Sequence, residues 1–217
     1  MKQLPRRGLC LVIAAPSGGG KGAITRALLD QEPELSLSIS VTTRTPRPDE
    51  TEGVHYHFRD KATFDAMVDD GGFLEYARVF GRNSYGTPRS PVERTLAEGR
   101  DMIFDIDWQG YRQLRAALPR DVVGIFLLPP SMAELERRLR GRGSDTEPEI
   151  IQRMQTAHNE ISHWSEFDHV VLNDDFDLAL HQCRAVLQAA RLTTGRQTGL
   201  AGFVATLDPT LDPTSGG

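Results

Sequence analysis

The sequence predicts an α/β fold with a parallel core sheet flanked by helices, and three observations support this prediction. Short apolar runs, such as residues 9–13 and 122–128, place hydrophobic residues in succession, as strands buried on both faces of a parallel sheet require. Stretches with helical spacing separate these runs. The first run leads through a glycine-rich loop into a helix, an arrangement that binds anions at the helix N-terminus.

The glycine-rich loop follows the template G-x-x-x-x-G-K-[S/T], in which backbone N–H groups surround a phosphate and the lysine reaches the outer phosphates. Four residues match the template: Gly18, Gly19, Gly20 and Lys21. Ala15 replaces the first glycine, and Gly22 replaces the residue that normally carries a hydroxyl. On this stretch alone, a glycine-rich turn with a chance lysine is the alternative. The buried strand before the loop and the helix after it favour a phosphate loop.

Composition restricts the class of protein. The 217 residues, 39% of them hydrophobic, suffice for one core with small inserted lobes. A net charge of −5 argues against a general nucleic-acid binder. Cys10 and Cys183 lie far apart in apolar segments, so we expect buried, reduced thiols. The apolar run near the N-terminus is too short for a signal peptide or a membrane span, and we therefore expect a cytoplasmic protein.

A segment rich in arginine and hydroxyl groups follows the first helix. Residues 36–41 alternate polar and apolar side chains, which predicts a half-exposed strand, and a second short strand is expected at Tyr56. Arg44 and Arg47 lie on either side of a proline, so an extended backbone lets both guanidinium groups converge on one anion. The hydroxyls of Ser40 and Tyr56 would complete this anion site. A solvated basic loop is the alternative.

The next segment offers neutral and acidic groups for a ligand. Residues 61–69 have the pattern of a short helix, and residues 73–79 alternate like a strand in which Glu75 has apolar neighbours. In the following turn, Tyr85 and Thr87 can bond a ligand without charge. A helix is expected over residues 88–98.

Two aspartates end the second buried strand, expected at residues 102–106. Asp105 and Asp107 therefore lie at the edge where open α/β sheets bind ligands, which is the edge of the phosphate loop. The alternative for Asp107 is a cap on the helix expected at 108–117, and a cap is compatible with a catalytic role.

Arginines mark the region after the third buried strand. A helix at 132–140 carries Arg138, a Gly-Arg-Gly turn carries Arg142, and a helix from about 150 to 162 carries Arg153. Two helices joined by such a turn are typical of a lid. The other helix arginines, Arg137 and Arg140, are interpreted as solvated. A last strand at 170–172 ends at Asn173, and a helix over 178–192 closes the domain.

The order and spacing of six motifs resemble the guanylate kinase family, whose members move a phosphoryl group from ATP to GMP. The motifs are PSGGGKG, SVTTRTPRPDETEGVHYHF, FLEYARVFGRNSYGT, DIDWQG, RLRGRG and NDD. The resemblance covers residues 9 to about 192. It implies a guanylate-kinase-like domain over 1–192, with a core (about 1–39, 88–136 and 164–192), a small GMP-binding lobe (about 40–87) and a helical lid (about 137–163). Residues 193–217 are expected to form a flexible tail.

Carried over residue by residue, the resemblance implies three groups of site residues. Those expected at GMP are Ser40, Arg44, Arg47, Tyr56, Glu75, Tyr85, Thr87, Asp105 and Asp107. Those expected at ATP are Ser17, Gly18, Gly19, Gly20, Lys21, Gly22, Ala23 and Asn173. Those expected around the transferring phosphoryl group are Lys21, Arg138, Arg142 and Arg153.

The chemistry of the substrates supports these residue types. One carboxylate such as Glu75 accepts hydrogen bonds from both N1–H and the amino group of guanine, whereas adenine presents a lone pair at N1. Phosphoryl transfer needs alignment and cations more than covalent help. Because residues 22 and 23 carry no hydroxyl, we expect Mg²⁺ to be held by phosphate oxygens and waters, with Asp105 or Asp107 anchoring the waters.

Two other functions fit parts of the sequence. A non-catalytic guanylate-kinase-like interaction module would keep the GMP lobe, but it would not explain Lys21 together with the lid arginines. A kinase for a phosphorylated sugar would not explain Glu75 and Thr87. We therefore expect ATP and GMP as partners, with no nucleic acid and no membrane, and leave open whether the chain forms a homo-oligomer.

Overall fold

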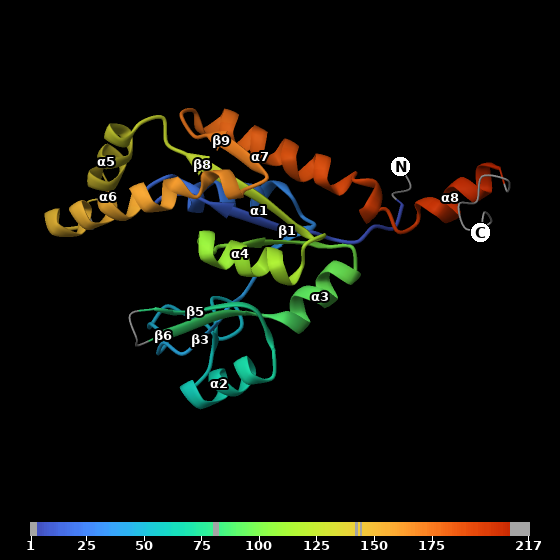
Figure 1. Ribbon diagram of the computed structural model, residues 1–217, viewed down its shortest axis with the longest axis horizontal. Helices are drawn as coiled ribbons and strands as arrows, with labels where there is room; N and C mark the ends of the chain where they lie inside the picture. The colour runs from blue at the N-terminus through green and yellow to red at the C-terminus, as the bar shows by residue number, and fades with distance from the viewer. Residues whose placement is uncertain (1–3, 80–82, 142, 144, 209–217) are drawn as a thin grey trace.

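A computed structural model describes residues 4–79, 83–141, 143 and 145–208 and contains two sheets (Figure 1). The larger sheet has five strands in the order β2-β7-β1-β8-β9, and every neighbouring pair is parallel. Its strands are β1 (Cys10–Ala14), β2 (Leu35–Leu37), β7 (Asp101–Phe104), β8 (Val122–Leu128) and β9 (His169–Leu172). The predicted α/β fold with a parallel core sheet is confirmed.

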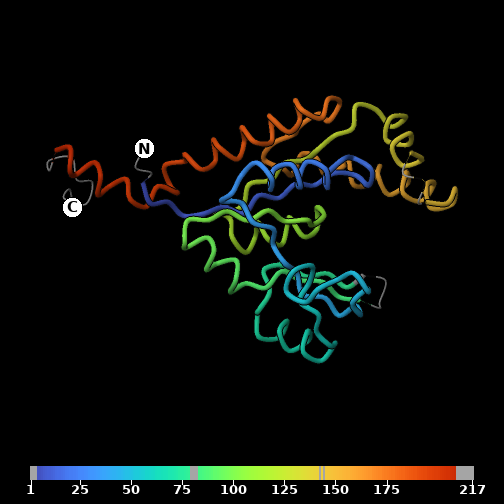
Figure 2. Tube along the Cα trace, turned by 180° about the vertical axis from the view of Figure 1, so that it is seen from behind, coloured from blue at the N-terminus to red at the C-terminus, as the bar shows by residue number. Residues whose placement is uncertain are grey.

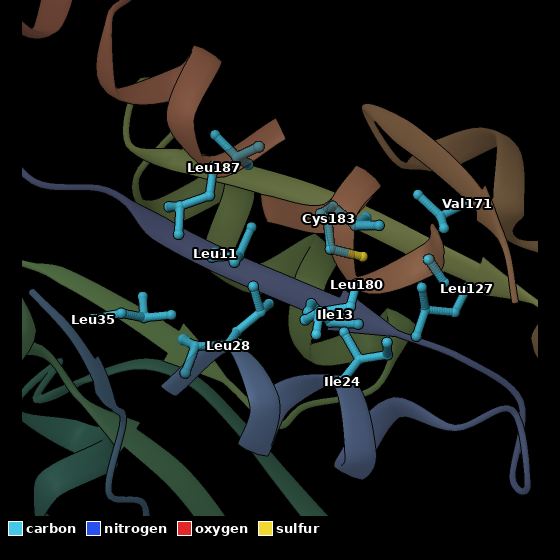
Figure 3. Close-up of a cluster of buried hydrophobic side chains, with 14 of the residues drawn as sticks. Leu11, Ile13, Ile24, Leu28, Leu35, Leu127, Val171, Leu180, Cys183 and Leu187 are labelled. Carbon is cyan, nitrogen blue, oxygen red and sulfur yellow. The ribbon is translucent and has the colours of Figure 1, made fainter. Parts of the chain in front are cut away.

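Helices cover both faces of this core sheet. On one face, α1 (Lys21–Gln31) and α7 (Phe176–Arg191) pack Ile24, Leu28 and Leu180 against the strands (Figure 3). On the other face lie α3 (Arg89–Ala97) and α4 (Trp108–Ala117). The near-continuous apolar sequence of β1 follows from this arrangement, because all five of its residues are buried. Both cysteines are free and buried, as predicted.

The smaller sheet has the order β4-β3-β6-β5 and carries α2 (Lys61–Asp69) on one face. Its strands are β3 (Val41–Thr42), β4 (His57–Phe58), β5 (Phe73–Val79) and β6 (Asn83–Pro88). The single strand expected over 36–41 is wrong. The chain leaves the core sheet after β2, where the Ser38 N–H donates to the Ile103 carbonyl, and enters the smaller sheet at β3.

Two helices, α5 (Met132–Gly141) and α6 (Glu147–Ser162), extend beyond the core sheet at the end opposite the chain termini (Figures 1 and 2). Helix α6 begins with a capping box, in which the Glu149 carboxylate accepts from the Thr146 N–H at 2.7 Å and from its hydroxyl. A 3₁₀ helix, η1 (Trp164–Glu166), follows α6 and leads into β9.

The segment after α7 differs from the flexible tail expected from residue 193. Through residue 208 it forms a 3₁₀ helix, η2 (Thr194–Arg196), and a helix, α8 (Leu200–Leu207). It is tied to the N-terminal segment, because the Arg7 N–H donates to the Arg196 carbonyl at 2.8 Å and the Gly199 N–H donates to the Pro5 carbonyl at 2.9 Å. The rest of the expected tail, residues 209–217, lies outside the described residues. Within the part of the chain that the structure describes, no helix is long and apolar enough to cross a membrane.

Candidate active site

The glycine-rich loop lies at the carboxyl end of β1 and is shaped for an anion. Gly18 and Gly20 have φ angles of 90° and 95°, in the left-handed region that favours glycine. The Asn173 side chain donates to the Gly19 carbonyl at 2.8 Å and fixes the loop from the end of β9. Among the described residues, no side chain caps the first turn of α1. The N–H groups of Ala23 and Ile24 donate to the Gly20 carbonyl, and those of Lys21 and Gly22 are left for a ligand.

A cavity of about 390 Å³ opens over this loop. Besides Ala15 and Pro16, its lining consists of Ser17, Gly18, Gly19, Gly20, Lys21, Gly22, Asp107 and Glu160. Lys21 pairs with Asp105, which is exposed at the carboxyl end of β7. Asp107 caps α4 through one oxygen, Oδ1, which accepts from the N–H groups of Gln109 and Gly110, each at 2.9 Å. The sheet edge therefore brings both aspartates to the loop, as the sequence predicts.

Helix α6 contacts the loop at Ser17. Arg153 donates from Nη1 to the Ser17 hydroxyl at 2.7 Å, and the Glu160 carboxylate accepts from the Ser17 N–H at 3.0 Å. Arg153 also pairs with Asp145 at 3.2 Å. The two contacts to Ser17 hold α6 against the phosphate loop.

Glu160 is a site residue that sequence reasoning missed. Burial raises its pKa, and the Ser17 N–H opposes this by stabilising the charged form. A signal was present in the sequence, since Glu160 follows Arg153 by seven residues and two helical turns place both on one face.

The structure shows different surroundings for the other arginines that the sequence places in or beside the expected lid. Arg138 donates to Glu134 at 2.8 Å and to the Asn173 carbonyl at 3.1 Å, which places it beside the loop. Arg137 and Arg140 pair with acidic residues on exposed faces, as predicted for solvated charges. Arg142 lies outside the described residues.

A second cavity lies between the core sheet and the smaller sheet. Its lining is Leu37, Ser38, Ser40, His55, Tyr56, Thr87, Phe104, Asp105 and Ile106. Asp105 lines this cavity and pairs with Lys21, which lines the loop cavity, so this ion pair forms a junction between the two cavities. This junction is the geometry that transfer between two ligands requires.

Tyr56, which lines the second cavity, has an aromatic and a basic side chain beside it. Tyr85 contacts Tyr56 edge-on, with ring centroids 5.9 Å apart, and the Arg44 guanidinium lies 5.5 Å from the Tyr56 ring. Arg44 also pairs with Glu50 at 2.6 Å, and this pairing lowers the pKa of Glu50 to about 2. Like Arg44 and Tyr85, Arg47 is not part of the cavity lining; it is exposed, and its N–H donates to Glu50 at 2.8 Å. Tyr56, Tyr85 and Arg44 are thus close together, and Arg47 lies beside them.

Glu75 and Thr87 form a buried pair on adjacent strands. They face each other in the β5–β6 register, and the Thr87 hydroxyl donates to Glu75 Oε1 at 2.6 Å. Burial raises the pKa of Glu75, and the Thr87 hydrogen bond partly offsets this. A buried carboxylate with one neutral partner has acceptor capacity for further donors.

The first turn of α1 has space for a hydroxyl side chain, but no hydroxyl of this turn lines the loop cavity. A Cβ atom at Gly22 would meet no atom within 4 Å, and Thr25 is buried and absent from the lining of that cavity. Among the described residues, no group of three His, Cys, Asp or Glu side chains is placed to hold a metal ion.

Comparisons with known proteins identify the family of this chain. A family model described as guanylate kinase matches residues 7–190. A guanylate kinase of Gluconobacter oxydans is 63% identical over 205 residues, which cover 94% of this chain and 98% of that protein. One of Granulibacter bethesdensis is 59% identical, with 91% and 93% covered. The crystal structure of guanylate kinase from Anaplasma phagocytophilum aligns with a TM-score of 0.74 at 34% identity and covers 94% of this chain and 97% of its own.

Proposed function

The chain belongs to the guanylate kinase family and phosphorylates GMP with ATP, and on this premise we propose how its residues divide the reaction. The ATP phosphates occupy the loop cavity and GMP occupies the second cavity. The observation that carries this assignment is the junction at Asp105, which lines one cavity and pairs with the lysine of the other. The smaller sheet with α2 then serves as the GMP-binding lobe, and α5 and α6 serve as the lid.

The phosphate loop binds the β- and γ-phosphates of ATP. Support comes from the left-handed glycines and from the uncapped N-terminus of α1, whose N–H groups and dipole favour an anion. Lys21 exchanges its exposed pairing with Asp105 for the outer phosphates. The exchange costs little, because exposed ion pairs contribute only about 0–1 kcal/mol.

Lid arginines stabilise the transferring phosphoryl group. Its charge spreads over three equatorial oxygens, so cations around it lower the barrier. Arg153 and Arg138 already lie at the loop, held by Ser17 and by Glu134 respectively. We propose that Arg142, which lies between the two lid helices in the sequence, acts together with these two arginines. Closing the lid also excludes water, which would otherwise receive the phosphoryl group.

GMP is recognised at both of its ends. Glu75 accepts hydrogen bonds from N1–H and the amino group of guanine, while Thr87 holds the carboxylate in place. Arg44 and Arg47 bind the GMP phosphate together with the hydroxyls of Ser40, Tyr56 and Tyr85. The Glu50 carboxylate, which contacts both arginines, keeps Arg44 extended until the phosphate arrives.

The residues at the loop fit a magnesium ion that accompanies ATP. Mg²⁺ keeps several waters and uses one or two carboxylates plus substrate phosphates. Asp107 has such a carboxylate, because its helix-capping bonds use Oδ1 and no described residue donates to Oδ2. When bound, the ion would neutralise charge between the β- and γ-phosphates. Asp107 would hold the waters of this ion. Asp105 would hold them as well, once Lys21 has exchanged it for the ATP phosphates.

The test of the proposed function is an assay of ADP formation with GMP, AMP and a sugar phosphate as parallel acceptors. We expect turnover with GMP to exceed the other two by orders of magnitude. Binding of GMP without phosphoryl transfer would favour an interaction module, and preferred turnover of the sugar phosphate would move specificity away from Glu75.

Replacing Glu75 tests guanine recognition separately. Glu75→Gln removes one of two acceptors, and the GMP-over-AMP preference should fall by about 10³-fold or more, since sites built to bond a substrate group discriminate by about 10⁴. Glu98→Gln, on an exposed remote glutamate, is the matched control. An unchanged preference in Glu75→Gln would place guanine recognition elsewhere.

The pH dependence of GMP binding follows from the same carboxylate. Because burial raises the pKa of Glu75, the carboxylate protonates at a higher pH than an ordinary glutamate. Protonation removes an acceptor, so KM for GMP should rise as pH falls through that raised value, while KM for ATP changes less. In the Glu75→Gln variant, KM for GMP should no longer rise as pH falls. If KM for GMP still rises in this variant, Glu75 is not the titrating group.

A further inference from the structure

A third cavity, of about 580 Å³, lies at the opposite end of the core sheet from the phosphate loop. It is lined by Arg7, Arg120, Asp121, Thr193, Gly195 and Arg196. These residues come from the segment before β1, the turn before β8 and the segment after α7. Three guanidinium groups therefore share a cavity with one carboxylate, and the proposed reaction uses none of them.

The one carboxylate is already neutralised. Arg7 binds Asp121 through two parallel hydrogen bonds, from Nε at 2.9 Å and from Nη2 at 2.7 Å. Such forked pairs are the strong form of arginine–carboxylate interaction. The charge of Asp121 is thus balanced mainly by Arg7.

Arg196 is a buried guanidinium with weak compensation. Its side chain is 8% exposed, it donates from Nη1 to the Gly8 carbonyl at 3.2 Å, and its ion pair with Asp121 is 3.7 Å long. Burial lowers the pKa of Arg196, with only partial compensation from Asp121. Asp101, also near, is bound by Arg6 and Arg191. Burying a charge without a close partner is costly, and an anionic ligand in the cavity would remove that cost.

Arg120 adds a second uncompensated charge at the mouth of the cavity. It is exposed, and in the described part of the chain no ion pair joins it to an acidic residue. With Arg7 neutralising Asp121, the cavity has two positive charges from Arg120 and Arg196. A phosphate monoester or inorganic phosphate carries close to two negative charges at neutral pH and takes forked guanidinium donors.

We propose that this cavity is a second anion site, which binds a phosphate-bearing ligand through Arg196, Arg120 and the free edge of Arg7. The site is separate from the catalytic one. Strand β1 runs between them, and its five residues span about 16 Å at ~3.3 Å per residue. The proposal does not depend on the assignment of catalytic residues.

Amide chemical shifts on titration with inorganic phosphate, at ionic strength held constant with chloride, test the proposal. We expect saturable changes at residues 120–121 and 193–196, distinct from any changes at loop residues 17–22. Arg120→Glu should raise the Kd of the cavity by about tenfold or more, because it replaces a charge-assisted donor with a repelling charge. Arg120 is exposed, so this variant should keep the fold.

Arg26→Glu is the matched control, since Arg26 is exposed on α1 and has the same change of charge. It should leave the Kd of the cavity unchanged. The proposal is overturned if phosphate causes no saturable change in the cavity, if chloride causes equal changes, or if Arg120→Glu binds as tightly as the wild type. The loop amides report in every variant that the protein is folded.

Discussion

Strand β7 carries an aspartate at its amino end, Asp101, and another just beyond its carboxyl end, Asp105, and the two are used in opposite ways. Asp101 is fully buried and accepts hydrogen bonds from Arg6, from Arg191 and from the Leu9 N–H. Asp105 has a side chain 62% exposed and pairs with Lys21. The same residue type is therefore fixed in a buried network at one end and held in an exchangeable pair at the other.

The buried network continues through Glu32, which accepts from Arg191, Arg184 and Gln188. Removing one member of such a network leaves an uncompensated buried charge, which costs about 3–5 kcal/mol, whereas exposed pairs contribute about 0–1 kcal/mol. Stability should thus depend on the amino ends of the strands. Pairs at the carboxyl ends can open for phosphate at little cost, and activity should depend on them.

The largest expected effect is on activity. Lys21→Met should lower kcat by about 10³-fold or more, since a cation over the transferring phosphoryl group contributes about 10³–10⁵ in comparable enzymes. The melting temperature should change by less than about 4 °C, because only an exposed pair is lost. Lys61→Met, on an exposed lysine paired with Asp65, is the control and should change neither quantity. A Lys21→Met protein with near-normal kcat would contradict the proposed role.

The next effect is on stability. Asp101→Asn removes the fully buried carboxylate that Arg6 and Arg191 share and leaves each of them only its second partner, Glu34 or Glu32, so the free energy of unfolding should fall by about 3–5 kcal/mol. Urea unfolding measures this change, with Glu98→Gln as the exposed counterpart expected to lose less than about 1 kcal/mol. Equal losses in the two variants would remove the distinction between buried and exposed pairs.

A smaller effect separates the two substrates. Arg44→Ala should raise KM for GMP by about 10–100-fold, because hydrogen bonds to charged groups contribute about 1.5–3 kcal/mol, and should leave KM for ATP nearly unchanged. Arg137→Ala, on an exposed arginine of α5, should affect neither KM. Equal effects of Arg44→Ala on both substrates would show that Arg44 does not bind the acceptor phosphate.

The smallest effect concerns the missing hydroxyl. Ala23→Thr should change kcat by less than about tenfold, or roughly 1.4 kcal/mol, because the Mg²⁺ proposal relies on phosphates, waters and Asp107. Gly22→Ser is the companion variant, since the position has open space around it. A gain well above tenfold in either variant would show that the native loop is limited by its lack of a hydroxyl.

The residues at the carboxyl ends of the core strands could be predicted from the sequence, because short local patterns indicate them. The loop, Asp105 and Asp107 each follow a buried strand directly, and Glu75 is acidic among apolar neighbours. The buried network at the amino ends of the strands could not be predicted. Arg6 and Asp101 are 95 residues apart, and no periodicity relates them.

Three further features escaped prediction for physical reasons. Arg196 lies in a Gly- and Thr-rich stretch that indicates a tail, and it is buried only because that stretch returns along the segment before β1. Helix α8 has apolar residues on all sides, so no amphipathic pattern indicated it. Glu160 reaches Ser17 only because α6 folds back onto the loop, a tertiary contact between residues 143 positions apart.

The independence of the two ends is tested most directly by a double-variant cycle with Lys21→Met and Asp101→Asn. Urea unfolding and kcat/KM for GMP are measured for the wild type, both single variants and the double variant. Distant sites are additive within about 0.5 kcal/mol, so each substitution should have the same effect in both backgrounds. A coupling energy above about 1 kcal/mol, or a loss of stability in Lys21→Met as large as in Asp101→Asn, would contradict the separation of activity from stability.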